Sequence, residues 1–284
     1  MTPDTSSPFG SFPPSGFYAR LLALSQGAPR NVFGKQLSGL ARDLYLWRGP
    51  LPADVSVGDL RMRCYLRDNT CERKFVFTPW RFDPQERAAI AAALPPDGVF
   101  VDIGANVGLY TLLAAAAMNT HGRIVALEPY LPAYQRLCFN IAATRAGRPD
   151  WPRIDALLLG VADDSRARSL TIDPGNLGGG SMAGGGARFS RAGAGDSVRV
   201  SCRPLMSILA DLGIETVDVL KIDIEGAEDV ALCPFLHDAP AELLPRRLVV
   251  ENSDHIWKTD LRAALAARGF TLSLRTRLNS VYGR

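Results

Sequence analysis

The stretch that most constrains this chain is Val99 to Gly108, which reads VFVDIGANVG. Its first four residues, mostly apolar, predict a short strand that ends in an acid, Asp102. Gly104 and Gly108 allow the backbone to turn sharply and to approach a ligand closely. The apolar, alanine-rich segment from Leu109 to Met118 then predicts a helix. A strand, a glycine turn and a helix in this order are typical of a nucleotide pocket in a doubly wound α/β fold.

This turn departs from the dinucleotide fingerprint G-x-G-x-x-G, in which a pyrophosphate rests on the helix N-terminus. Here the order is D-x-G-x-N-x-G, with Asp102 in place of the first glycine and Asn106 two residues after Gly104. A carboxylate at the start of a helix repels phosphate but suits a cation. S-adenosylmethionine offers a sulfonium and an ammonium group to such a site, and its carboxylate suits backbone N–H groups. The turn therefore favours S-adenosylmethionine over a nicotinamide cofactor.

A second motif, KIDIEGAE, runs from Lys221 to Glu228. Together with DIGANVG it resembles the FkbM family of class I S-adenosylmethionine-dependent methyltransferases, whose members carry DIGANxG followed later by KIDxEGAE. The resemblance covers roughly residues 60 to 284 and implies a Rossmann-like α/β sheet, mostly parallel with an antiparallel last strand. It also implies O-methylation of a hydroxyl on a saccharide, glycolipid or natural product. Family members carry the same residue types at a further group of positions, namely Asp68, Asn69, Glu72, Asn140, Asn176, Gly178 and Asn279.

Composition and charge limit the partners and the cell compartment that this protein can be expected to have. The net charge of +3 is spread along the chain and does not indicate a nucleic-acid partner, so the expected acceptor is a small molecule or a saccharide. Five separated cysteines without a C-x-x-C pair suggest neither a zinc site nor a disulfide framework, and predict a cytoplasmic protein with reduced thiols. The first residues lack the features of a secretory signal, and no apolar run reaches the length of a membrane span. A homo-oligomer is left open.

The chain divides into three segments by composition. Residues 1–16 are rich in Pro, Ser and Gly and are expected to be disordered. Residues 17–82 predict a helical and hairpin extension, whose helical part either packs plainly on the core, the favoured interpretation, or lines the acceptor site. Residues 83–284 form the expected methyltransferase domain. Its first helix is expected to begin with a capping box, in which Asp83 is the N-cap and Glu86 closes the box.

The cofactor candidates follow the first three strands of this domain. Glu128 ends the strand that begins at Arg123, a little over twenty residues beyond the glycine turn, where doubly wound folds place a carboxylate on ribose hydroxyls. Residues just past the third strand, expected over Ile154–Gly160, often flank adenine in class I methyltransferases. The predicted cofactor-binding set is therefore Asp102, Gly104, Asn106, Gly108, Glu128, Val161 and Asp163.

Three acids and a histidine lie at or just past the ends of the fourth and fifth parallel strands, Val217–Ile222 and Arg247–Glu251. Ligands in open α/β sheets bind outside the carboxyl ends of the strands, so these groups are expected to face the methyl group. Removing a proton from an alcohol near neutral pH requires a general base or a metal ion. Two mechanisms stay open, a base among the catalytic candidates Asp223, Glu225 and His255, or a divalent cation such as Mg²⁺ held by Asp223, Glu225 and Glu251.

Two rival functions use the same kind of fold. A nicotinamide-dependent oxidoreductase shares the sheet and the acid after its second strand, and a non-catalytic binding module keeps the cofactor fold as a scaffold. The glycine-rich stretch at residues 175–195 adds a further open question, because it suits either a segment that closes over substrate or a flexible linker. Binding of S-adenosylhomocysteine or of NAD would separate the functions.

Overall fold

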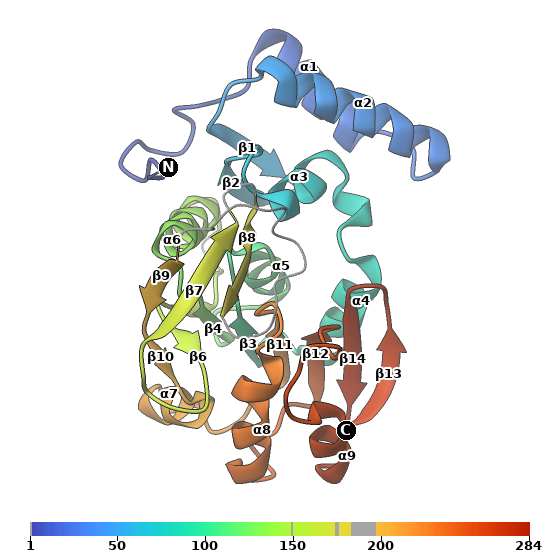
Figure 1. The fold of residues 1–284 in the computed structure, drawn as a ribbon. Helices are drawn as coiled ribbons and strands as arrows, with labels where there is room; N and C mark the ends of the chain where they lie inside the picture. The colour runs from blue at the N-terminus through green and yellow to red at the C-terminus, as the bar shows by residue number, and fades with distance from the viewer. Residues whose placement is uncertain (1, 149, 174–175, 183–196) are drawn as a thin grey trace.

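The computed structural model describes residues 2–148, 150–173, 176–182 and 197–284. A seven-stranded sheet, in the order β13-β14-β12-β11-β3-β4-β5, forms its centre (Figure 1). Every neighbouring pair is parallel except those of β14, which runs antiparallel to both β12 and β13. This order confirms the predicted class I methyltransferase fold. The strands are β3 Val99–Ile103, β4 Arg123–Leu127, β5 Arg153–Leu157, β11 Val219–Ile222, β12 Arg247–Glu251, β13 Thr271–Arg275 and β14 Asn279–Gly283.

Helices cover both faces of the sheet because alternate residues of each central strand point to opposite sides. One buried cluster includes Phe100, Ile124, Val219 and Val249, and the other includes Val101, Val125, Leu220 and Leu248. Strands that are buried on both faces consist of nearly continuous apolar residues, and for this reason their positions could be predicted from the sequence. The helices of this part are α4 Pro84–Ala93, α5 Leu109–Ala117, α6 Leu131–Arg145, α7 Leu205–Asp211, α8 Glu228–Asp238 and α9 Leu261–Ala267.

Two smaller sheets lie beside the central one. The third parallel strand ends at Leu157, earlier than expected, and the next short strand, β6 Gly160–Val161, pairs instead with β10 Cys202–Arg203. A three-stranded sheet in the order β8-β7-β9 contains β7 Arg168–Asp173, β8 Asn176–Met182 and β9 Ser197–Val200. Strands β7 and β9 thus lie on either side of the glycine-rich stretch. Most of residues 175–195 lies outside the described residues.

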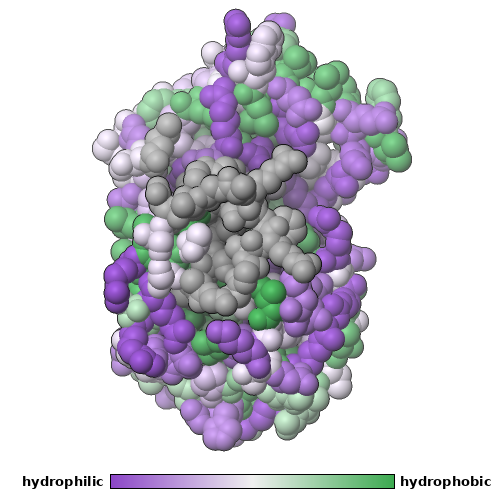
Figure 2. Space-filling view, in the orientation of Figure 1, coloured by the Kyte–Doolittle hydropathy of each residue, from purple (hydrophilic) through white to green (hydrophobic). Residues whose placement is uncertain are grey.

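The predicted helical and hairpin extension lies at the end of the molecule farthest from α8 and α9 (Figure 1). Ring contacts hold its segments together, since Tyr18 packs edge-on against Tyr45, and Tyr45 against Phe77. The Phe82 ring, at the end of the extension, packs against Tyr110 of α5. Hydrophobic side chains are also visible over its first two helices, at the top of Figure 2. No helix within the described ranges is long and apolar enough to cross a membrane. The elements are α1 Gly16–Gln26, α2 Val32–Arg48, β1 Ala53–Val57, β2 Leu60–Cys64, α3 Thr70–Phe77 and η1 Pro79–Arg81.

The N-terminal segment differs from the expected disorder, because residues 2–15 are held by a buried ion pair. The Arg63 guanidinium pairs with Asp54 at 2.7 Å and donates hydrogen bonds to the carbonyls of Asp4, Ser7 and Pro8. The backbone amides of Gly10 and Phe12 donate to Asp54 Oδ2. Backbone groups, together with the Phe12 ring that lies against the Arg63 guanidinium, therefore fix this segment, and its composition gives no sign of these contacts.

The predicted capping box at the start of α4 is wrong. Asp83 has a left-handed backbone, with φ of 39°, and its side chain does not cap the helix. Its carboxylate accepts a hydrogen bond from Tyr110 Oη at 3.0 Å and pairs with Lys74. Glu86 reaches the C-terminal turn instead, where it accepts from Thr276 Oγ1 at 2.6 Å and from Asn279 Nδ2 at 3.2 Å. Both acids therefore join segments that are distant in the sequence.

Candidate functional site

The glycine turn after β3 packs tightly against the loop after β11. Gly104 has a φ of +78°, and a Cβ at this position would lie 2.0 Å from the backbone oxygen of Asp223. Gly108 has a φ of +93°, and a Cβ there would meet Leu137 Cδ1 at 2.7 Å. Asn106 adopts a φ of +52° between them. The two predicted motifs are thereby in backbone contact, and only glycine fits at the point where they meet.

Asp102 is fully buried and supports Lys221 rather than lining the cavity. The two residues face each other in the β3–β11 register, with Lys221 Nζ 3.9 Å from Asp102 Oδ1. Asp102 Oδ2 accepts from Thr111 Oγ1 at 2.7 Å, whereas Oδ1 has no hydrogen-bond partner within the part of the chain that is described. Burial raises the pKa of Asp102, and the Lys221 charge opposes this. Burial acts to lower the pKa of Lys221, but the charges of Asp223 and Asp102 outweigh burial and raise this pKa.

Glu128 lies at the carboxyl end of β4, against the glycine turn. Its Oε2 accepts from the backbone amide of Asn106 and its Oε1 from that of Tyr130, both at 2.8 Å. Burial raises the pKa of Glu128 to about 7, although both amides act to lower it. Each oxygen of a carboxylate can accept a second hydrogen bond. Glu128 can therefore serve two hydroxyl donors while it holds the turn in place.

A cavity of about 310 Å³ opens at the carboxyl edge of the sheet, beside this turn. The turn and the start of α5 form one wall, α3 a second, the loops after β11 and β12 a third, and the turn before β14 a fourth. Its charged and polar lining residues include Lys74, Asp83, Asn106, Tyr110, Asn176, Lys221, Asp223, Glu225, Glu251, Arg277 and Asn279.

Three acids meet in this cavity as predicted. Oxygen atoms of Asp223, Glu225 and Glu251 lie within 4.8 Å of one another, and the Glu225 amide donates to Glu251 Oε2 at 3.2 Å. Burial and the neighbouring carboxylate charges raise the pKa of Glu225 to about 8 and that of Glu251 to about 10. Such a cluster binds either protons or a cation, because carboxylates this close resist ionising together. Oxygen ligands of this kind suit a hard divalent ion.

Several functional contacts have no local signal in the sequence. The Tyr110 ring lies over Lys221 Nζ at 4.7 Å, and its hydroxyl holds Asp83. Asn69 Nδ2 donates to Asn106 Oδ1 at 3.1 Å, which ties the start of α3 to the glycine turn. In the sequence, Tyr110 looks like one more apolar residue of α5. Only the family resemblance indicates Asn69.

Asn140 and Asn176, also indicated by resemblance alone, bridge distant segments. Asn140 accepts from the Arg63 amide at 2.9 Å and donates to the Val107 carbonyl at 3.0 Å. Asn176 accepts from the Thr70 amide at 3.1 Å and lines the cavity. Both asparagines therefore join the extension to the methyltransferase part.

Six predicted site residues do not line this cavity. Asp102, Gly108 and Glu128 form or support the glycine turn beside it, whereas His255, Asp163 and Val161 lie elsewhere. His255 is exposed and does not line the cavity, although it lies just past the strand that Glu251 ends. Asp163 pairs with Arg168 and its side chain is 52% exposed. Val161 is buried and lines a separate cavity of about 210 Å³, together with Gly226 and Ala227 of the second motif. The structure thus brings Asp223, Glu225 and Glu251 together but leaves His255 outside their group.

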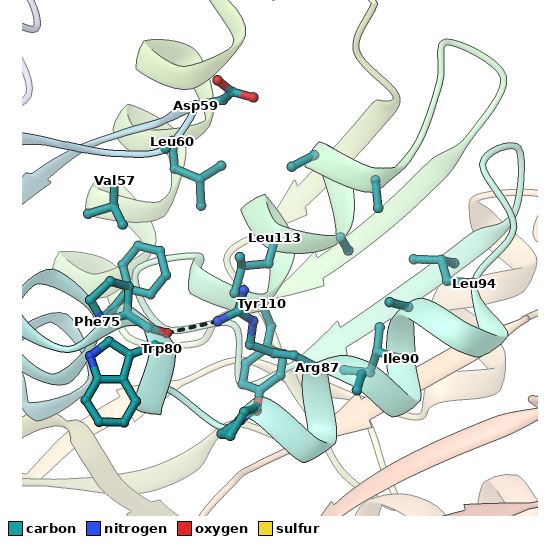
Figure 3. Close-up of a pocket in the computed structure, with 18 of the residues that line it drawn as sticks. Val57, Asp59, Leu60, Phe75, Trp80, Arg87, Ile90, Leu94, Tyr110 and Leu113 are labelled. Atoms are coloured by element: carbon teal, nitrogen blue, oxygen red, sulfur yellow. Dashed lines mark hydrogen bonds between the residues drawn. The ribbon is translucent and has the colours of Figure 1, made fainter. Parts of the chain in front are cut away.

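A larger cleft of about 680 Å³ lies on the other side of Tyr110, between α4, α5 and the hairpin (Figure 3). Its walls are mainly apolar, with Leu60, Phe75 and Leu113 among them, and Arg87 donates to the Pro79 carbonyl at 3.1 Å. Neither motif contributes a residue to this cleft, which α5 lines from Tyr110 to Ala117. The smaller cavity, where the acids converge, is therefore the candidate site.

A family model described as the methyltransferase FkbM domain matches residues 102–271, which is more than half of the chain and includes both motifs. The chain belongs to the FkbM methyltransferase family. The match begins at Asp102 and spans the glycine turn, Glu128 and the three clustered acids. The family match confirms the FkbM resemblance that the two motifs indicated.

Curated relatives are similar over part of their length. The AMB antimetabolite synthetase AmbE of Pseudomonas aeruginosa is 29% identical over 223 residues, which are 64% of this chain but only 10% of that protein. The methyltransferase sdnD of Sordaria araneosa is 28% identical over 207 residues, 64% of this chain and 77% of that protein. The chain thus spans about a tenth of the first relative. Among solved structures, the methyltransferase FkbM from Methylobacillus flagellatus is 17% identical, covers 77% of this chain and 56% of its own, and has a TM-score of 0.44.

Proposed function

We propose that this chain transfers the methyl group of S-adenosylmethionine to a hydroxyl oxygen of a saccharide, glycolipid or other natural product. The observation that carries the proposal is the acidic cavity beside the glycine turn, within a domain of the FkbM family. Acids outnumber cations in its walls, and the pKa values of Glu225 and Glu251 are raised. The carboxylates of this cluster repel one another when they are ionised. A ligand that brings positive charge, as a sulfonium and an ammonium do, relieves this repulsion.

The residues around the turn fit S-adenosylmethionine, which would supply an electrophilic methyl group. Glu128 keeps acceptor capacity for the ribose hydroxyls, and Gly104, Asn106 and Gly108 bring backbone close to the ligand. Val161 and Asp163 are assigned to the adenine end, with stronger support for Val161 because it lines a cavity beside the second motif. Asp102 contributes indirectly, by holding Lys221 and through it Asp223.

The acceptor hydroxyl must lose its proton as its oxygen attacks the methyl carbon in line with the departing sulfur. Asp223 and Glu225 face the cavity and are better placed than His255 to take that proton. In the alternative, Mg²⁺ held by Asp223, Glu225 and Glu251 would acidify the hydroxyl. Methyl transfer measured with and without EDTA separates the two, because only the metal route stops on chelation and returns with added Mg²⁺.

Isothermal titration with S-adenosylhomocysteine tests the cofactor. We expect a Kd in the micromolar range for the wild type, and at least a tenfold weaker Kd, about 1.4 kcal/mol, for Glu128→Gln. Glu215→Gln, an exposed acid outside the cavity, is the matched control and should bind as the wild type does. If the wild type binds NAD instead, the oxidoreductase function replaces this one. If the wild type binds neither ligand, the role of a non-catalytic binding module replaces the proposed function.

A further inference from the structure

Helix α2 buries three small residues and one aromatic ring, and it turns most of its large apolar residues outward. Its buried positions are Gly34, Ser38, Ala41 and Tyr45. Phe33, at 66% exposed, and Trp47, at 71%, lie on another face with Leu37, Leu40 and Leu44, at intervals of three or four residues. A helix that packs on a protein core normally has the reverse arrangement. The outward face therefore has a use other than packing within this chain.

Exposed apolar side chains concentrate in this part of the molecule. Eleven large hydrophobic residues are exposed within the described ranges, and seven of them lie in the helical pair at residues 16–48. The hydrophobic colour over this pair is visible at the top of Figure 2. Single exposed apolar residues are ordinary, but grouped ones mark a surface that contacts something. The seven are Phe17, Leu24, Val32, Phe33, Leu40, Leu44 and Trp47.

The same pair of helices is strongly basic. Residues 16–48 contain five basic residues and one acid, a net charge of +4, whereas the whole chain has +3. Arg42 pairs with the single acid, Asp43, at 2.8 Å. As far as the described residues show, the other four, Arg20, Arg30, Lys35 and Arg48, contact no carboxylate. The partner that fits this surface is apolar and anionic.

We propose that the α1–α2 pair docks on an anionic lipid surface. Amphipathic helices with Phe, Trp and Leu on one side and Lys or Arg on the other lie in the interface plane, where buried apolar area and attraction to anionic lipid act together. A second copy of this chain fits less well, because two such faces would bring +4 against +4. The docking does not depend on the proposed reaction.

Docking of this kind has a consequence for the cavity. Helix α3, which contacts both α1 and α2, contributes Thr70, Cys71 and Lys74 to the cavity wall. The acidic site is therefore one helix away from the docked surface. If the proposed function holds, this placement favours acceptors that have a lipid anchor, such as glycolipids.

Sedimentation with lipid vesicles tests the docking. The full chain is mixed with vesicles of phosphatidylcholine alone or with added phosphatidylglycerol, at low and at raised salt. The test variant is the double substitution Leu40→Gln and Leu44→Gln. Its matched control is Leu131→Gln and Leu272→Gln, at side chains that are 49% and 51% exposed on other elements. Circular dichroism and melting curves check that both doubles fold as the wild type does.

We expect the wild type to bind the anionic vesicles, less at raised salt, and the test double to bind about tenfold more weakly or worse. The control double should bind as the wild type does. Failure of the wild type to bind, or equal binding by the two doubles, overturns the proposal. So does a dimer in light scattering that the test double dissociates, because the face then belongs to a second copy. Should the test double not fold, the fluorescence of Trp47 decides instead: a blue shift with anionic vesicles that is lost in Trp47→Phe supports docking, and no shift contradicts it.

Discussion

Gly104 and Gly213 share a left-handed backbone, with φ of +78° and +64°, but differ in their surroundings. A Cβ at Gly104 would lie 2.0 Å from the Asp223 backbone oxygen, whereas none of the described atoms lies within 4 Å of one at Gly213. We expect Gly213→Ala to lose about 1 kcal/mol of unfolding free energy from backbone strain alone. Gly104→Ala should lose about 3 kcal/mol or more, and its binding of S-adenosylhomocysteine, because the loop that carries Asp223 must move. Urea denaturation compares the two variants, and equal losses would contradict the role of this contact.

Glu72 is a buried acid outside the cavity whose titration opposes folding as pH rises. Burial raises its pKa to about 8 from an ordinary value of 4.5, although Arg136 and the Tyr65 amide act to lower it. At a pH between these two pKa values, Glu72 has released its proton in the unfolded chain but keeps it in the folded chain. The free energy of unfolding therefore falls as pH rises, by up to about 1.4 kcal/mol per pH unit from this group.

The variant Glu72→Gln removes this titration but keeps a carbonyl that can accept from the Tyr65 amide, as Glu72 Oε2 does at 2.6 Å. We expect its stability relative to the wild type to increase steadily from pH 5 to pH 8 and then to level off. Urea denaturation over this range measures the difference. The exposed Glu215→Gln should keep the wild-type slope. Parallel curves for wild type and Glu72→Gln would show that Glu72 ionises in the folded state as freely as in the unfolded one.

At the scale of elements, the sequence predicted the strands and turns whose form depends on neighbouring residues alone. Strands β3 and β11 are apolar runs because both faces of the sheet bury them, and the turn between β3 and α5 needs glycine. The convergence of Asp223, Glu225 and Glu251 follows from the same rule, since the carboxyl ends of parallel strands meet at one edge.

Long-range contacts account for the parts that the sequence could not predict. Asp83 and Glu86 have the spacing of a capping box, yet they bind Tyr110 and the turn before β14, which no local pattern indicates. Residues 2–15 are held by the Arg63–Asp54 pair through backbone groups that are the same in every sequence. Glu251 ends β12 and His255 lies in the loop that follows, and only the path of this loop decides that Glu251 reaches the cavity and His255 does not.

At the scale of the whole molecule, one buried cluster crosses the predicted boundary at residue 82. Tyr45 and Phe77 of the extension belong to the same cluster as Phe100 and Val219 of the central sheet. Tyr45 is fully buried, its hydroxyl donates to the Pro50 carbonyl at 3.3 Å, and its ring packs against Tyr18 and Phe77. The extension and the sheet should therefore unfold together, because this buried cluster is continuous across the boundary, where Phe82 also packs against Tyr110 of α5.

We expect Tyr45→Ala to lower the midpoint of one cooperative transition and to lose about 3 to 5 kcal/mol of unfolding free energy. Leu44→Ala, at the neighbouring exposed position, should change stability by no more than about 0.5 kcal/mol. Calorimetry gives the number of transitions, and far-ultraviolet circular dichroism and tryptophan fluorescence should coincide if there is one. Two separate transitions, of which Tyr45→Ala shifts only one, would contradict the shared core. Residues 17–82 would then fold as a unit of their own, and the surface of α1–α2 could be lost without loss of the methyltransferase sheet.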